Sequence, residues 1–155
     1  MIGRVKRYFG IEGVKVFLDA PEEVTTRKGR IEGEVSFASM NRQEVTEVRV
    51  RLIERYARGR GDNKKIDEYE MGSIFLKQKI QIEPEQESRL PFVLPFKKLR
   101  SEVDEFANRN FLFQGLASLA KSAYAAQSEY YIIAEAKVKG TALSPFIKKA
   151  IDIRG

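Results

Sequence analysis

Residues 44–56 read E-V-T-E-V-R-V-R-L-I-E-R-Y, and their side chains alternate between apolar and polar types. Successive side chains of a β-strand point to opposite faces of the sheet, so this spacing predicts a strand with one buried and one solvated face. The predicted buried face carries Val48, Val50, Leu52 and Tyr56. The predicted solvated face carries Glu47, Arg49, Arg51 and Arg55.

A turn-forming stretch, G-R-G-D-N-K-K at residues 59–65, follows this strand. A second alternating run then places four aliphatic side chains on one face: Ile74, Leu76, Ile80 and Ile82. Two alternating runs joined by a turn are typical of a β-hairpin. The sequence therefore predicts one long hairpin from about Glu44 to Ile82.

Other alternating runs predict further strands on both sides of the hairpin, at residues 14–18, 31–37, 90–96, 130–138 and 147–153. Gly33 lies inside one of them, which indicates a bulge or a close backbone approach. Pro91 and Pro95 lie in another, and proline cannot donate a ladder hydrogen bond, so we expect that strand at a sheet edge. Seven or more short strands with frequent turns favour an all-β antiparallel sandwich.

One segment, residues 101–127, breaks the two-residue period and has helical spacing instead. It is rich in Ala, Leu and Phe, and Ser101 is suited to be the N-cap of a helix. We therefore expect a helical insertion over residues 101–127 of the sandwich. The chain of 155 residues has the size of one domain, so we expect a single domain over residues 1–155.

The composition narrows the classes of function. The chain has neither histidine nor cysteine, which removes the Ser-His-Asp triad, thiolate catalysis and the usual zinc ligands. We therefore expect no enzyme activity, no cofactor and no metal site, and a hydrolase that uses carboxylates alone is the catalytic alternative. No apolar run is long enough to span a membrane, no apolar stretch follows the basic residues of the N-terminus, and we expect a cytoplasmic protein. The net charge of +6 is compatible with anionic partners and equally with a role in solubility.

The order of the predicted strands supplies a further indication. A G-V-x-V start at residue 13 precedes R-I-E-G-E-V at 30–35 and Q-E-V at 43–45, which leads into V-R-V-R-L-I-E-R-Y at 48–56. L-P-F-V-L-P at 90–95, Y-I-I-A-E-A-K-V at 131–138 and K-K-A-I-D-I at 148–153 complete the series. This set resembles the arrestin N-terminal-type domain, in the form found in the sporulation-control protein family of bacteria and archaea. The resemblance implies an immunoglobulin-like sandwich that acts as a non-catalytic scaffold or adaptor without a cofactor.

The first candidate contact surface is the basic turn of the hairpin, formed by Arg55, Arg58, Arg60, Lys64 and Lys65. Side chains of this kind attract phosphate groups and acidic peptides. The plainer interpretation is a solvated loop whose charges serve solubility. A domain that binds membranes or nucleic acid through this basic surface is the alternative function, and the sequence favours it less than protein binding.

The second candidate is the apolar face of the expected helix, which includes Phe111, Leu112 and Leu116. Such a face either covers the sandwich or docks a partner, and we rank formation of a homo-oligomer above membrane binding. Two groups of carboxylates, at residues 67–70 and 83–87, are interpreted as exposed charges of turns and edges. Finally, an open sheet edge would let a partner peptide add a strand, and the sequence leaves open which edge that is.

Overall fold

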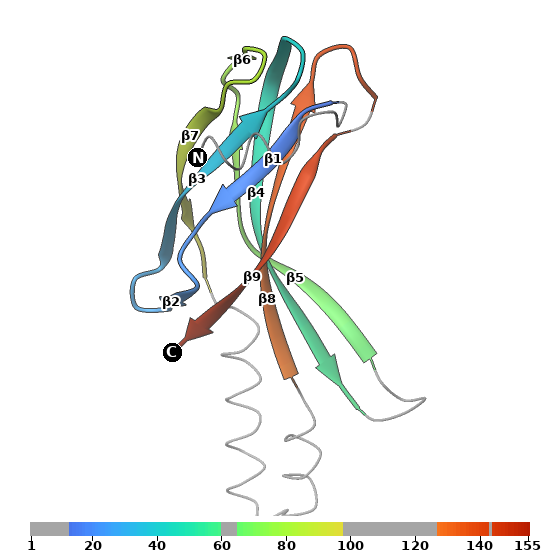
Figure 1. The fold of residues 1–155 in the computed structure, drawn as a ribbon. Coiled ribbons are helices and arrows are strands. Elements are labelled where there is room, and N and C mark those ends of the chain that lie inside the picture. The colour runs from blue at the N-terminus through green and yellow to red at the C-terminus, as the bar shows by residue number, and fades with distance from the viewer. Residues whose placement is uncertain (1–12, 60–64, 98–126, 143) are drawn as a thin grey trace, which may run out of the picture.

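A computed structural model describes residues 13–59, 65–97, 127–142 and 144–155, and these ranges contain nine β-strands and no helix (Figure 1). The strands are β1 (Lys15–Asp19), β2 (Glu23–Thr25), β3 (Arg30–Ala38), β4 (Gln43–Arg58), β5 (Lys65–Leu76), β6 (Ile80–Ile82), β7 (Ser88–Pro95), β8 (Gln127–Val138) and β9 (Phe146–Arg154). The all-β prediction is thus confirmed for the described residues.

The strands form two sheets. The smaller sheet has the order β1-β3-β7, and the larger has the order β2-β9-β8-β4-β5 with β6 paired to β4. All described pairings are antiparallel except that of β2 with β9, which run parallel. Figure 1 shows β4, β5, β8 and β9 extending past the end of the smaller sheet.

The central element of the larger sheet is β4, whose 16 residues pair with β8 along one edge and with β5 and β6 along the other. The predicted hairpin is confirmed between β4 and β5, but its second arm is divided, because residues 77–79 separate β5 from β6. A bulge also interrupts β5. Leu52 lies opposite Gly72 and Ile53 lies opposite Glu70, which leaves Met71 as the extra residue.

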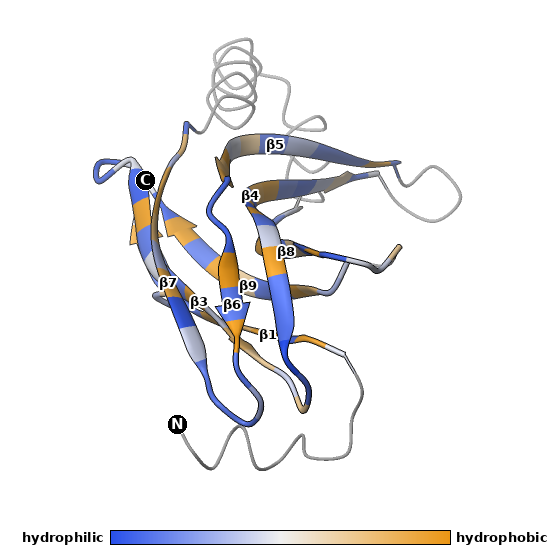
Figure 2. Ribbon diagram, turned by 90° about the horizontal axis from the view of Figure 1, so that it is seen from above, coloured by the Kyte–Doolittle hydropathy of each residue, from blue (hydrophilic) through white to orange (hydrophobic). Residues whose placement is uncertain are grey.

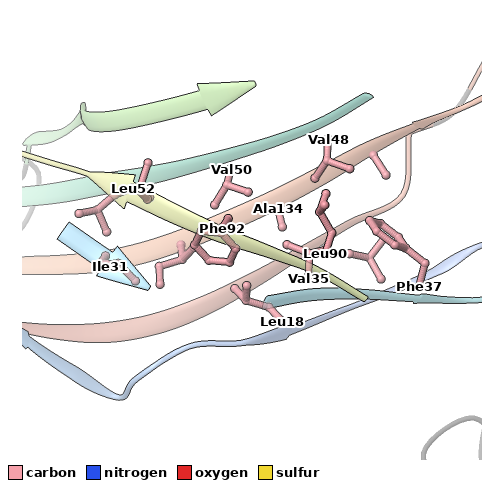
Figure 3. Packing of buried hydrophobic residues seen from close by; sticks show 14 of the residues in the cluster. Leu18, Ile31, Val35, Phe37, Val48, Val50, Leu52, Leu90, Phe92 and Ala134 are labelled. Atoms are coloured by element: carbon pink, nitrogen blue, oxygen red, sulfur yellow. The ribbon is translucent and has the colours of Figure 1, made fainter. Parts of the chain in front are cut away.

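The two sheets share one hydrophobic core, as Figure 3 shows from close by. Val35 and Phe92 from the smaller sheet face Val50 and Ala134 from the larger one, and all four side chains are at most 4% exposed. The predicted buried residues Val48, Val50 and Leu52 are fully buried in this cluster, whereas Tyr56, predicted on the same face, is only partly buried. The every-second-residue pattern is therefore the cause of the two-layer packing, and alternating apolar and polar bands can be followed along β9 in Figure 2.

The two residue types singled out in strands lie as expected. The strand with Pro91 and Pro95 is β7, and it forms an edge of the smaller sheet. Gly33 marks a close backbone approach, since a Cβ there would lie 2.7 Å from the carbonyl oxygen of Asp19 and 2.7 Å from the ring of Phe92. The pairing of β3 with β7 is regular at Gly33, so the alternative of a bulge there is wrong.

The expected helical insertion falls almost entirely on residues 98–126, which lie outside the described residues. Its last residue, Gln127, begins strand β8 instead, where it pairs with Ala57. Within the described ranges, no helix has the length and apolar character needed to cross a bilayer.

Gly72 provides a test of the packing between β5 and the end of β7. A Cβ at this position would overlap the carbonyl oxygen of Pro95 and lie 3.2 Å from the Cβ of Phe96. Because the obstructing atom belongs to the backbone, Gly72→Ala should lower the free energy of unfolding by about 1–3 kcal/mol, measured by urea denaturation.

Gly155→Ala is the matched control, because no atom lies within 4 Å of the added methyl group and the backbone there is not strained. This variant should unfold at the wild-type urea concentration. Equal stability of the Gly72 and Gly155 variants would contradict the close approach of β5 and β7.

Candidate functional site

One edge of the larger sheet is only half covered. The C-terminal half of β9 pairs with β2, from Asp152 to Arg154. Two hydrogen bonds extend this pairing: the Asp152 amide donates to the Glu22 carbonyl over 2.8 Å, and the Thr26 amide donates to the Arg154 carbonyl over 2.8 Å. The N-terminal half of β9 has β8 on its other side, and no strand of the described residues pairs with its outer edge.

The direction of the peptide groups along this open half follows from the bonds to β2. Within a strand, the N–H and C=O of alternate residues point to the same edge. Asp152 and Arg154 turn these groups toward β2, so Ala150, Lys148 and Phe146 turn theirs toward the same side, beyond the end of β2. The open half of β9 therefore presents a row of backbone donors and acceptors to any strand placed beside it.

A hollow lies beside the open half of β9 and is lined by residues of β1 and of the β8–β9 turn. Its volume is about 990 Å³. The described residues that line it are Gly13, Val14, Lys15, Val16, Phe17, Gln43, Val138, Thr141, Ala142, Ser144, Pro145, Phe146 and Ile147. We call this hollow, together with residues 146–150 of β9, the β9 groove. Its lining is mainly apolar, with one lysine and no carboxylate among the described residues.

Phe146 gives the groove an exposed apolar rim, since 64% of its surface is accessible. Lysines supply the charge. The Lys149 Nζ donates to the Ala20 carbonyl oxygen over 2.9 Å, at the end of the groove nearest β2. The Lys148 Nζ lies 4.1 Å from the centroid of the Tyr131 ring, on the outer face of the sheet. The groove thus combines apolar contact area, backbone hydrogen-bonding groups and positive charge.

Tyr131 connects Lys148 to a small polar network on the outer face. Its hydroxyl donates to the Glu129 Oε2 over 2.6 Å, and this hydrogen bond is the main reason why its pKa is raised. Desolvation and the negative charge of Glu129 act in the same direction, while Arg55 opposes them. The tyrosine therefore stays protonated to higher pH than usual and holds Glu129 beside β9.

A second polar group lies on the opposite, core-side face of the sheet. Glu54 is fully buried; the Ser128 hydroxyl donates to its Oε2 over 2.8 Å, and the Tyr130 hydroxyl does so over 3.4 Å. These contacts tie β4 to β8. Among the described residues, no cluster of His, Cys, Asp or Glu has a geometry that could hold a metal ion.

The predicted basic turn does not form one surface in its described part. Arg55 and Arg58 are three residues apart in β4, so their side chains lie on opposite faces of the sheet. The Arg58 Nη2 lies 3.6 Å from the Asp67 Oδ2, and Lys65 is opposite Arg58 in the register. Arg60 and Lys64 lie outside the described residues, as do Phe111, Leu112 and Leu116 of the expected helix.

The carboxylates interpreted as exposed charges mostly form ion pairs with arginines. Asp67 pairs with Arg58, Glu70 with Arg49 and Glu83 with Arg42. The β9 groove, by contrast, was not singled out from the sequence. Its signal is the K-K pair at residues 148–149 inside an otherwise apolar alternating strand, since lysine on a strand is typical of an edge.

The described residues thus form two β-sheets with a shared core, and among them no strand pairs with the outer edge of the N-terminal half of β9. A protein-family model described as SpoOM protein matches residues 2–98, which is more than half of the chain. The chain therefore belongs to the SpoOM protein family, as the resemblance noted in the sequence indicated. No curated protein sequence matches it.

Comparison with solved structures supports the fold. The crystal structure of Spo0M, a sporulation control protein from Bacillus subtilis, matches with a TM-score of 0.63 and 13% sequence identity. The match covers 94% of this chain and 51% of the Bacillus protein, so the chain spans about half of that protein's length. At this identity the likeness concerns the fold alone.

The polar network beside the groove is testable by titration. Glu129→Gln removes both the charged acceptor and the negative charge that raise the pKa of Tyr131, so this pKa should fall. The phenolate signal of Tyr131, followed by NMR across the alkaline range, should then appear at lower pH than in the wild type.

Glu135→Gln serves as the control, since Glu135 lies on the same outer face but is not among the groups that shift Tyr131. This variant should leave the pKa of Tyr131 at its wild-type value. If Glu129→Gln leaves the Tyr131 titration unchanged, the hydrogen bond is not the cause of the shift.

Proposed function

We propose that this domain is a non-catalytic interaction module with an arrestin-type, immunoglobulin-like sandwich, and that it binds a segment of a partner polypeptide in the β9 groove. The observation that carries the proposal is the open half of β9 lying directly beside an apolar hollow. The backbone groups of an unpaired strand edge are complementary to the backbone of another strand. An extended polypeptide is therefore the ligand that matches both parts of the groove.

Family membership and the order of the strands support the arrestin-type assignment. The matched Bacillus protein is described as a sporulation control protein. We extend to this chain the role of a cytoplasmic scaffold or adaptor that works by recruiting a partner. Because the chain spans about half of that protein, the proposal concerns the interaction module and not the activity of a longer protein.

The groove suits a protein partner better than a nucleic acid or an anionic membrane. Those ligands require a concentrated positive surface. Three of the four arginines of β4 have other contacts: Arg49 pairs with Glu70, Arg58 pairs with Asp67, and Arg55 lies against Tyr131. The described part of the hairpin is thus balanced in charge, whereas the groove offers mostly apolar surface.

Site-specific photo-crosslinking in the native host tests this function. A photoreactive amino acid at Ala142, an exposed residue of the groove lining, should form a covalent adduct with a partner protein. The same amino acid at Lys28, an exposed residue of the β2–β3 turn outside the groove, should not.

Phe146→Asp connects the adduct to the groove itself. Phe146 is largely exposed, so this change should leave the circular dichroism spectrum and urea midpoint unaltered while it removes apolar contact area. The Ala142 adduct should then be lost. Absence of an adduct in the wild type, equal crosslinking from Lys28, or an adduct that survives Phe146→Asp would overturn the proposed function.

A further inference from the structure

We infer that the segment held in the β9 groove runs parallel to β9, in line with β2, and alternates apolar with acidic side chains. This inference rests on the proposed function and specifies the ligand of the same site. It follows from three observations: the direction of β2, the position of the Lys149 ammonium group, and the two faces that the groove offers to an incoming strand.

The first observation is that β2 already shows how a strand lies on this edge. It runs parallel to β9, and its buried residue Val24 points toward the core. Glu22 and Thr26 lie two residues before and after Val24, and both form backbone hydrogen bonds with β9. The core-facing positions of β2 are therefore the ones whose peptide groups point toward β9. A parallel peptide beside residues 146–150 would continue this ladder with the same spacing, and its C-terminal end would meet Ala20, just before β2.

The second observation concerns charge at that end. The Lys149 Nζ donates to the Ala20 carbonyl oxygen, which places an ammonium group where a parallel peptide ends and an antiparallel peptide begins. A carboxylate, from an acidic side chain or a chain terminus, is attracted to this position, and an amino terminus is repelled. Charge therefore favours the parallel direction over the antiparallel one.

The third observation sets the side-chain pattern. Peptide side chains on the core side would enter the hollow between Val14, Val16 and Ile147, so apolar residues fit there. Side chains on the outer face would lie next to Lys148, where a carboxylate is the favourable cross-strand neighbour. Because successive side chains of a strand point to opposite faces, a peptide that fits both the hollow and Lys148 alternates apolar with acidic residues.

The same lysine argues against a second copy of the domain as the occupant. If two copies paired symmetrically through the open halves of β9, the strands would be antiparallel, and pairing centred on residue 148 would place Lys148 opposite Lys148. Like charges directly opposite each other destabilise strand pairing. Pairing between the β9 edges of two copies is therefore unfavourable, whereas pairing of β9 with an acidic strand is favourable.

Synthetic probes test the direction of binding. The reference probe is a fluorescein-labelled decapeptide that alternates valine with glutamate, and its affinity for the full chain is measured by fluorescence anisotropy. Two modified probes carry N-methyl groups on all valines or on all glutamates. In β2, which runs parallel to β9, the core-facing positions turn their peptide groups toward β9. The amides of the core-facing valines of a parallel probe would therefore donate to β9, so methylation of the valines should abolish binding.

Methylation of the glutamates should leave the affinity within about threefold, since those amides would point away from β9 in the parallel arrangement. If the probe bound antiparallel with its valines still facing the core, the glutamate amides would donate to β9 and the valine amides would point away. The opposite result, in which only glutamate methylation abolishes binding, would overturn the parallel direction and leave the proposed function standing.

The charge pattern has its own test. A valine–lysine decapeptide should bind about tenfold more weakly than the valine–glutamate probe, and Lys148→Glu should reverse this preference. Lys28→Glu, at an exposed position outside the groove, is the control and should preserve it. An unchanged preference in Lys148→Glu, or no binding of the reference probe while the Ala142 adduct still forms, would overturn the inference without affecting the proposed function.

Discussion

The contact between the inner faces of the two sheets is the interaction on which the rest of the molecule depends. Val35 and Phe92 pack across the interface against Val50 and Ala134, and each reaches its place because apolar residues recur at every second position. A shift of one residue in any of these strands would turn its apolar set to solvent. Where the pattern must change, at Met71, a bulge absorbs the extra residue beside the close contact of Gly72 with Pro95.

The treatment of the sheet edges follows from the same alternation. In β7, two prolines remove amide donors from an edge strand, so that edge is a poor template for another strand. In β9, β2 occupies one half, and the other half keeps its backbone groups beside an apolar hollow. Of these two edges, that of β7 is blunted by its prolines, whereas the open half of β9 keeps its backbone groups available beside Lys148 and Lys149.

Local patterns were sufficient to predict most of the fold. The alternation around Val48, Val50 and Leu52 gave the long central strand, and Pro91 and Pro95 indicated an edge strand. Strand β2 was not predicted, because three residues are too short to show a period and its position depends on pairing with β9, far away in the sequence. The groove was missed for the same reason: it arises from the tertiary approach of β1 to β9, and neither segment alone indicates a hollow. The opposite orientation of Arg55 and Arg58 follows from alternation, but the composition of the turn suggested one common basic surface.

The pairing of β2 with β9 has a consequence for how the chain acquires its structure. It joins residues 23–25 to residues 152–154, so the larger sheet closes only when segments separated by well over a hundred positions meet. Contacts of such long sequence separation make folding slow, because the entropy of closing a large loop is lost before the contact forms. During synthesis on the ribosome, the larger sheet therefore lacks the strand between β2 and β8 until β9 has emerged. For that interval the β8 edge that later pairs with β9 is unpaired in the nascent domain, and unpaired strand edges make folding intermediates prone to aggregate.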